Sequence, residues 1–308
     1  MTTQTRRFGG PDRDPRDELA GMRQELEERI AFLLADGEHR GHADMLSLAM
    51  RAGALSAGKR MRPLLLMLVA RDLGCASPAV TDVACAVELV HAASLMLDDM
   101  PCMDNAMLRR GKPTVHVQFG DAQAMLAGDA MQALAFEVLT PLSGVPPALQ
   151  ARLCGLLARS AGHAGMAGGQ AIDLASIGLQ LDEHTLRDMH HRKTGALLQA
   201  SVVMGAACGS ATPTQWAALS DYGDALGLAF QVVDDILDVT QASATLGKTA
   251  GKDLNDNKPT YVTVLGLDAA RRHAGELRDK AQAALARSEL ADASCLSLLA
   301  DRVVEREH

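Results

Sequence analysis

Aromatic residues are scarce in this chain, and their scarcity limits what the protein core can be. Phenylalanine, tryptophan and tyrosine together make up 3% of the 308 residues, so the interior must be built from aliphatic side chains. Alanine, leucine and methionine dominate, and these residues favour helices. Valines lie within helix-like segments rather than alternating in short runs, so the sequence predicts no convincing strand.

An excess of basic charge is also missing. The net charge of −8 argues against a general nucleic-acid binder, because such proteins present a basic face. The six cysteines form no CxxC pair, which favours reduced thiols in a cytoplasmic protein over a disulfide framework. The densest apolar run, Leu64 to Ala70, is far too short to cross a bilayer, so we expect no transmembrane segment.

Helical patterns recur along most of the chain, with Gly and Pro between them. Residues 1–16 are polar and are expected to form a flexible tail. Apolar residues at steps of three and four then predict a helix that begins near Leu19 and stops at Gly37, and a second, buried helix is predicted from Met61 to Leu73. Further helices are predicted at Pro78–Asp99, Asp121–Leu139, Pro147–Met166, Glu183–Cys208, Pro213–Val239 and Pro259–Arg287. Residues 17–308 are therefore expected to form a single all-helical domain, one large bundle with a central active-site cavity.

An acidic cluster follows the apolar stretch that ends at Leu97. Asp98, Asp99 and Asp104 surround Pro101, which cannot sit inside a helix, so the helix should end or bulge here. That break could bring Asp104 back towards Asp98. Charges at the end of an apolar helix are costly unless they are exposed, paired or bound to metal. Taken alone, this cluster is explained equally well by a solvated helix end or by a metal site.

A second acidic cluster comprises Asp234, Asp235 and Asp238. Asp234 and Asp238 are four residues apart, so they share one helix face with Cβ atoms roughly 5–6 Å apart, where like charges repel. A hard divalent cation would relieve the repulsion, and all-oxygen ligands suit Mg²⁺. Because the same acidic pattern occurs twice, the interpretation of these residues as a merely exposed acidic helix edge becomes difficult to support.

Basic residues lie near both acidic clusters in the sequence, and each alone could be a solvated surface charge. The groups are Lys59, Arg60 and Arg62; Arg109, Arg110 and Lys112; Lys193; and Lys248, Lys252 and Lys258. Together they predict a site for two diphosphates, one bridged to the acids by metal and one held directly by Arg and Lys. His190 and His191 show no zinc pattern, and Gly165 to Gly169 is not a P-loop, so we interpret both as structural.

These motifs resemble those of the trans-isoprenyl diphosphate synthases, over about Gly53 to Asp268. The similarity lies in Gly58–Pro63, Val90–Asp104, Leu108–Thr114, Leu126–Asp129, Lys193–Thr194, Gln231–Asp238 and Thr245–Lys248. The stretch from Val90 to Thr114 is most similar to bacterial geranylgeranyl diphosphate synthases, particularly those of carotenoid biosynthesis. Asn105 and Ala106 depart from the pattern, since many relatives continue there with further aspartates.

The resemblance implies a role for each matching residue. Asp98, Asp104 and Asp234 would bind metal, with Asp99, Asp235 and Asp238 completing the two motifs and Lys193 in the catalytic group. The residues implied to hold the allylic diphosphate are Arg109, Lys193, Thr194, Gln231, Lys248 and Lys258, and those implied to hold isopentenyl diphosphate are Lys59, Arg62, His91 and Arg110. The implied cofactor is Mg²⁺, about three ions with Mn²⁺ able to substitute. The implied assembly is a homodimer.

The implied reaction adds isopentenyl diphosphate to dimethylallyl, geranyl or farnesyl diphosphate and yields all-trans geranylgeranyl diphosphate and pyrophosphate. Ala93 and Ser94 are small, and Ala93 stands where related farnesyl diphosphate synthases commonly carry a large aromatic tunnel floor. A farnesyl diphosphate synthase that stops at fifteen carbons remains an alternative, because methionines such as Met96 could close the tunnel instead. A class I terpene cyclase and a non-catalytic regulatory subunit are alternatives of other classes.

Overall fold

The computed structural model describes residues 14–35, 45–240 and 259–305 of the chain. Helices account for nearly all of the regular structure in these ranges. Their bounds are α1 (Pro15–Leu33), α2 (Met45–Ala54), α3 (Met61–Asp72), α4 (Ala79–Asp98), α5 (Val115–Phe119), α6 (Asp121–Leu139), α7 (Pro147–Ala161), α8 (Met166–Ala175), α9 (Glu183–His190), the π-helix η2 (His191–Gly195), α10 (Ala196–Cys208), α11 (Pro213–Thr240), α14 (Tyr261–Leu265), α15 (Leu267–Arg287) and α16 (Ser294–Val304). The all-α prediction is confirmed.

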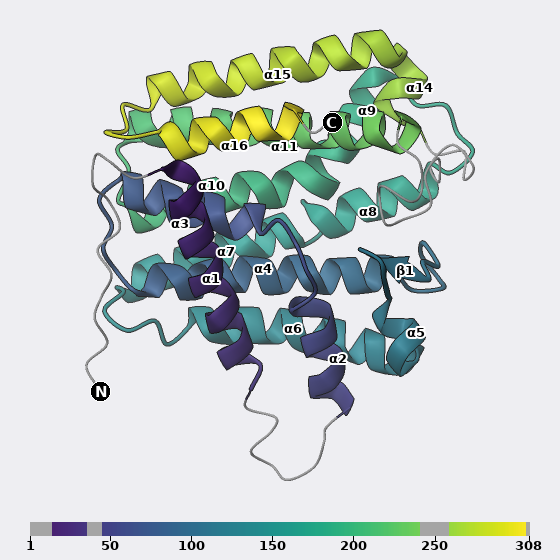
Figure 1. The fold of residues 1–308 in the computed structure, drawn as a ribbon, viewed down its shortest axis with the longest axis horizontal. Coiled ribbons are helices and arrows are strands. Elements are labelled where there is room, and N and C mark those ends of the chain that lie inside the picture. Colours follow the sequence, from purple (N-terminus) through teal and green to yellow (C-terminus); the bar gives the residue numbers. More distant parts are fainter. Residues whose placement is uncertain (1–13, 36–44, 241–258, 306–308) are drawn as a thin grey trace.

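The helices stack in layers, from α15 at the top of Figure 1 through α11, α10 and α4 to α6 at the bottom. The central layers are apolar on every side. Leu64 to Ala70 in α3 are all buried, and so is most of α4. By length and composition α4 could cross a membrane, but 72% of its apolar window is buried inside the bundle. Because the aromatic content is low, small and aliphatic side chains fill the core and let the helices approach closely.

The sequence predictions fail where tertiary contacts or single glycines decide the backbone. The predicted helix Pro147–Met166 is wrong, because Gly162 adopts an extended conformation that ends α7 and a separate α8 follows from Met166. Likewise Gly266, with φ of +83°, divides the predicted Pro259–Arg287 helix into α14 and α15. Within Glu183–Cys208 the helix runs through the five-residue π-helix η2. The helices α2, α5, α8 and α16 were not predicted.

A two-stranded hairpin also departs from the predicted absence of strands. Strand β1 (Leu108–Arg109) pairs antiparallel with β2 (Lys112–Pro113). Arg110 and Gly111 form the turn with φ of +53° and +75°, the signs that a two-residue type I′ hairpin turn requires. The hairpin is too short to show an alternating pattern in the sequence.

Close contact between α3 and α10 depends on Gly205. A Cβ added at Gly205 would lie 2.5 Å from the backbone oxygen of Leu66. Gly155, in the exposed part of α7, has nothing within 4 Å of such a Cβ. We therefore predict that Gly205→Ala lowers the free energy of unfolding by about 1–3 kcal/mol, because overpacking forces the helices apart. Gly155→Ala, the matched control, should raise it by about 0.5–1 kcal/mol through helix propensity. Denaturant titration of both variants measures the two effects, and equal effects would contradict this packing.

Candidate active site

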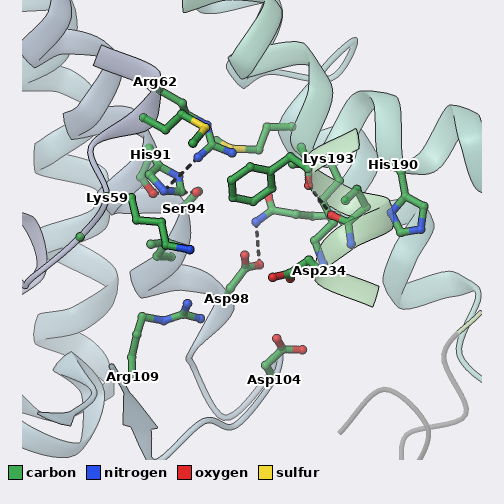
Figure 2. A pocket seen from close by; sticks show the side chains of 18 of the residues that line it. Lys59, Arg62, His91, Ser94, Asp98, Asp104, Arg109, His190, Lys193 and Asp234 are labelled. Carbon is green, nitrogen blue, oxygen red and sulfur yellow. Dashed lines mark hydrogen bonds between the residues drawn. The ribbon is translucent and has the colours of Figure 1, made fainter. Parts of the chain in front are cut away.

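A cavity of 690 Å³ gathers most of the residues that the sequence singled out. It lies between the start of α3, α4, the β1–β2 hairpin, α8, η2 and α11. The predicted site residues that line it are Lys59, Arg62, His91, Ser94, Asp98, Asp104, Arg109, Arg110, Lys193, Thr194, Gln231, Asp234, Asp235 and Asp238. Figure 2 shows Asp98, Asp104 and Asp234 directed into the same space, with Lys59, Arg62 and His91 on another side.

The first acidic motif folds back on the end of α4. The helix stops at Asp98, and the turn through Pro101 returns the chain so that the Asp104 N–H donates to the Asp98 carbonyl at 2.9 Å. The predicted return of Asp104 towards Asp98 is therefore confirmed. Asp99 lies outside the cavity lining and is buried. Its carboxylate accepts hydrogen bonds from Arg109 Nε at 2.7 Å and Nη2 at 2.7 Å, a bidentate pair that aims the guanidinium at the cavity.

Asp98 accepts a hydrogen bond from a neutral donor and lies within the field of a nearby cation. Gln170 Nε2 donates to its carboxylate at 2.6 Å. Burial raises the pKa of Asp98, the Lys193 charge lowers it, and the Asp104 carboxylate raises it again. A half-buried carboxylate beside another carboxylate favours a partner that brings positive charge. Carboxylate oxygens of this kind fit Mg²⁺ chemically.

The second acidic motif lies on α11, across the cavity from the first. Asp234 is directed into the cavity, whereas Asp235 is buried and accepts from Gln231 Nε2 and from the Tyr261 N–H, both at 2.8 Å. The Thr194 hydroxyl in turn donates to Gln231 Oε1 at 2.8 Å. Asp235 therefore joins α11 to η2 and to the start of α14.

No group of three or more His, Cys, Asp or Glu side chains within residues 14–35, 45–240 and 259–305 is arranged to hold a metal unaided. Pairs of carboxylates instead face a shared space. Mg²⁺ commonly binds one or two carboxylates and completes its octahedron with water and phosphate oxygens. The donor set therefore fits metal that arrives with a diphosphate substrate.

The opposite side of the cavity is cationic. Arg62 Nη1 lies 3.2 Å from His91 Nε2, and because arginine offers no acceptor, His91 Nε2 accepts and the ring proton sits on Nδ1. Burial, followed by the charges of Arg62 and Arg110, holds the pKa of His91 well below its usual 6.5. Arg110 donates to the Ala57 carbonyl, and Gly58 permits this approach since an added Cβ would lie 2.6 Å from Arg110 Nη1.

Sequence reasoning missed several residues that line the cavity. Gln170 and Asp173 come from α8, where Asp173 pairs with Lys193 Nζ at 2.6 Å. A Cβ at Gly169 would lie 2.2 Å from the backbone nitrogen of Lys193, so this glycine lets α8 pack closely against η2. Gln170 and Asp173 are three residues apart and so share one face of α8, which the sequence could have indicated. The prediction ended a helix at Met166, where α8 begins, and therefore contained no helix for these two residues.

Other lining residues are not among those to which the family resemblance assigns a role. Arg60 and Glu88 line the cavity and pair with each other. His190, interpreted above as structural, also lines it and stacks on Tyr261 with ring centroids 5.5 Å apart. Burial, with the charge of Lys193 next, lowers the pKa of His190 to about 3, so its ring is neutral.

Two sets of predicted residues lie elsewhere. Ala93 is fully buried outside the cavity lining, whereas its neighbour Ser94 lines the cavity. Lys248 and Lys258 lie outside the described residues, as does the rest of the Thr245–Lys248 motif.

An all-helical bundle with facing aspartate motifs and a cationic pocket defines an enzyme of the isoprenoid synthase fold class. Residues 43–296 match the model of the family described as polyprenyl synthetase. The chain is 45% identical over 262 residues to a chloroplastic geranylgeranyl pyrophosphate synthase of Catharanthus roseus, covering 84% of this chain and 73% of that protein. It is 44% identical over 265 residues to a probable farnesyl diphosphate synthase of Sinorhizobium fredii, covering 85% and 79%.

A solved structure agrees with these relatives. The geranyltransferase of Helicobacter pylori, complexed with magnesium and isoprenyl diphosphate, superposes with a TM-score of 0.78 at 29% identity and covers 97% of this chain and 98% of its own. The chain belongs to the polyprenyl synthetase family. It is a trans-prenyltransferase that elongates isoprenyl diphosphates.

The neutral state of His91 gives a testable pH dependence. Because its folded pKa lies well below 6.5, we predict that its ring takes up no proton between pH 8 and 6 in the substrate-free protein. The unfolded chain does bind that proton, so this residue lowers the free energy of unfolding as the pH falls below 6.5. Histidine-ring NMR, with His91→Gln to assign the signal, measures the titration. A midpoint near 6.5 would contradict the geometry.

Proposed function

We propose that this enzyme condenses isopentenyl diphosphate with dimethylallyl, geranyl and farnesyl diphosphates and releases all-trans geranylgeranyl diphosphate and pyrophosphate. The observation that carries the proposal is the division of one cavity into an acidic side and a cationic side. An acidic side needs metal to bind a diphosphate, whereas a cationic side binds one directly. The cavity therefore suits two diphosphates that bind in different ways.

Magnesium is the cofactor that we propose, in line with the magnesium bound to the Helicobacter pylori geranyltransferase. Asp98 and Asp104 would hold it from one side and Asp234 from the other. When bound, Mg²⁺ neutralises the charge that develops on the departing diphosphate. About three ions, with Mn²⁺ as a substitute, is our proposal from the family resemblance.

The protein's own side chains bind the two substrates and exclude water. Arg109 and Lys193 would hold the allylic diphosphate, and Lys59, Arg62, His91 and Arg110 would hold isopentenyl diphosphate. All six residues line the cavity, which supports these roles. The allylic carbon–oxygen bond breaks, the isopentenyl double bond forms the new carbon–carbon bond, and the proton then lost passes to the released diphosphate. Apolar lining by Leu95, Met166 and Phe230 keeps water from the carbocation.

Small side chains beneath the metal motif favour a twenty-carbon product. Ser94 lines the cavity four residues before Asp98, about 6 Å down α4, and Ala93 is buried next to it. A chain of more than fifteen carbons needs room at this depth. The Catharanthus roseus relative, a geranylgeranyl pyrophosphate synthase, supports this length, and the Sinorhizobium fredii relative represents the fifteen-carbon alternative.

We also propose that the enzyme is a cytoplasmic homodimer. The helices α2, α5 and α6 pack together along the lower side of Figure 1. They expose large apolar side chains, namely Met45, Leu48, Val117, Met125 and Leu126, each more than 40% accessible. An apolar surface of this kind favours a protein partner, and a second copy is the partner that the family resemblance implies. Sedimentation velocity measures the oligomeric state.

The proposed function is tested by incubation with Mg²⁺, farnesyl diphosphate and labelled isopentenyl diphosphate. We predict a twenty-carbon diphosphate. A cyclic hydrocarbon would indicate a terpene cyclase. Turnover when geranyl diphosphate replaces farnesyl diphosphate, with none from farnesyl diphosphate, would indicate a farnesyl diphosphate synthase. No turnover with either allylic substrate would indicate a regulatory subunit.

In the same assay Asp98→Asn and Asp234→Asn should each lower turnover by at least 100-fold, since each removes a charge that holds metal. Asp279→Asn, on the exposed face of α15, is the control. Near-normal turnover of either site variant at low Mg²⁺ would refute the metal assignment.

Product length tests the role of Ser94 and Ala93. We predict that Ser94→Tyr shifts the main product from geranylgeranyl to farnesyl diphosphate, because a ring would fill the cavity beneath Asp98. Ala93→Tyr should do the same if the growing tail passes behind Ser94. Chromatography of the dephosphorylated products reads the outcome. If neither substitution changes the chain length, the floor of the tunnel lies elsewhere.

A further inference from the structure

Arg60 adopts a strained backbone conformation at the entrance to α3. Its φ of 51° and ψ of 32° place it in the left-handed region, immediately before the helix begins at Met61. A residue with a side chain pays roughly 1–2 kcal/mol for this conformation, so the surroundings must hold it there. Glycine would adopt the turn without strain. The side chain of Arg60 must therefore do something that glycine cannot.

That side chain is buried and ties three parts of the chain together. Arg60 is 4% exposed and donates from Nη1 to Glu88 Oε1 on α4 at 2.6 Å. Its Nη2 donates to the Ser56 carbonyl at 2.8 Å, and its Nε lies 3.4 Å from Glu27 Oε1 on α1. Each guanidinium nitrogen thus faces an oxygen acceptor of the protein. Arg60 and Glu88 both line the cavity, whereas the other two acceptors of Arg60, on Ser56 and Glu27, lie outside its lining.

Lys59, directly before Arg60, and Arg62, two residues after it, are proposed ligands of isopentenyl diphosphate. The Lys59 carbonyl accepts from Arg23 Nη2 on α1 at 3.2 Å, so the backbone of this turn is also held from α1. On the other side, Arg62 meets His91 on α4 at 3.2 Å. His91 follows Glu88 by three residues and so lies on the same face of α4. Arg60–Glu88 and Arg62–His91 thus join the turn and the first residues of α3 to one face of α4.

Stability alone is a weak reason for a buried ion pair here. Replacing such a pair with apolar residues of similar volume is often neutral or stabilising, whereas removal of one partner leaves a buried charge. A lone Glu88 would also repel a diphosphate in the cavity that it lines. Arg60 neutralises that carboxylate and fixes the turn through one side chain.

We propose that the Arg60–Glu88 pair is a positioning device for the metal-free diphosphate site. It holds the left-handed turn so that Lys59 and Arg62 present their charges to isopentenyl diphosphate. Arg60 is a positioning residue and is not itself a ligand of that substrate. This inference rests on the proposed function, because it assumes that isopentenyl diphosphate binds on this side of the cavity.

The test compares single and paired substitutions by melting temperature and by the KM of each substrate. Arg60→Met and Glu88→Leu should each lower the melting temperature, while the double variant should restore it. In the double variant the KM for isopentenyl diphosphate should stay at least tenfold above wild type, with the KM for farnesyl diphosphate within about twofold. Glu88→Gln keeps an oxygen for Arg60 Nη1, so its KM for isopentenyl diphosphate should stay within about threefold. Arg29→Met/Asp82→Leu, which removes an ion pair between α1 and α4 outside the cavity lining, is the control and should leave both KM values unchanged.

Three results would overturn the proposal. A double variant with the wild-type KM for isopentenyl diphosphate would show that the pair is merely structural. A raised KM in Arg60→Met combined with an unchanged one in Glu88→Leu would make Arg60 a direct ligand. If the double variant does not fold, Arg60→Lys decides, because lysine keeps the charge but cannot reach both Glu88 and Ser56. Its KM for isopentenyl diphosphate should rise at least fivefold, and a wild-type value would refute positioning. Wild-type enzyme without condensation activity would instead reject the proposed function.

Discussion

Carboxylates from the ends of α4 and α11 line one cavity, and the cost of gathering negative charge in that space governs how the site is built. Burial and the neighbouring Asp104 raise the pKa of Asp98, while Lys193 opposes them. Several cationic side chains line the cavity, but two of them pair with carboxylates of the protein: Arg109 with Asp99 and Lys193 with Asp173. The acids that remain directed into the cavity are suited to metal brought by substrate. An acidic protein can in this way bind anionic substrates.

The same principle explains why the aspartates of each motif differ in role. Asp98 and Asp234 point into the cavity, whereas Asp99 orients Arg109 and Asp235 joins Gln231 to the start of α14. Each motif thus combines a residue for the ligand with a residue that fixes the geometry around it. The cationic side follows the same logic, with Arg60 and Glu88 beneath the turn that carries Lys59 and Arg62.

The sequence predicts the parts of this site that depend on local chemistry. Three features can be recognised from neighbouring residues alone: the paired aspartates in an apolar context, the helix break at Pro101 and the cationic turn before α3. Each places charge, or a proline, where it would be unfavourable without a partner or a break in the helix. Gln170 and Asp173 escape prediction because a glycine contact, Gly169 against Lys193, brings their helix to the site. The Arg60–Glu88 pair joins residues 28 apart in sequence, and no periodicity links them. Ser94 rather than Ala93 lines the cavity. Which of the two faces inward depends on how α4 is rotated about its axis, and its packing against neighbouring helices sets that rotation.

If one cavity holds two diphosphate sites, only the acidic site should depend on metal. Isothermal titration calorimetry with isopentenyl diphosphate and with a non-hydrolysable farnesyl thiodiphosphate, each with Mg²⁺ and with EDTA, tests it directly. We expect isopentenyl diphosphate to bind with similar affinity under both conditions, whereas the farnesyl analogue should lose at least tenfold in affinity without Mg²⁺. Equal dependence of both ligands on Mg²⁺ would contradict the division of the cavity into an acidic and a cationic side.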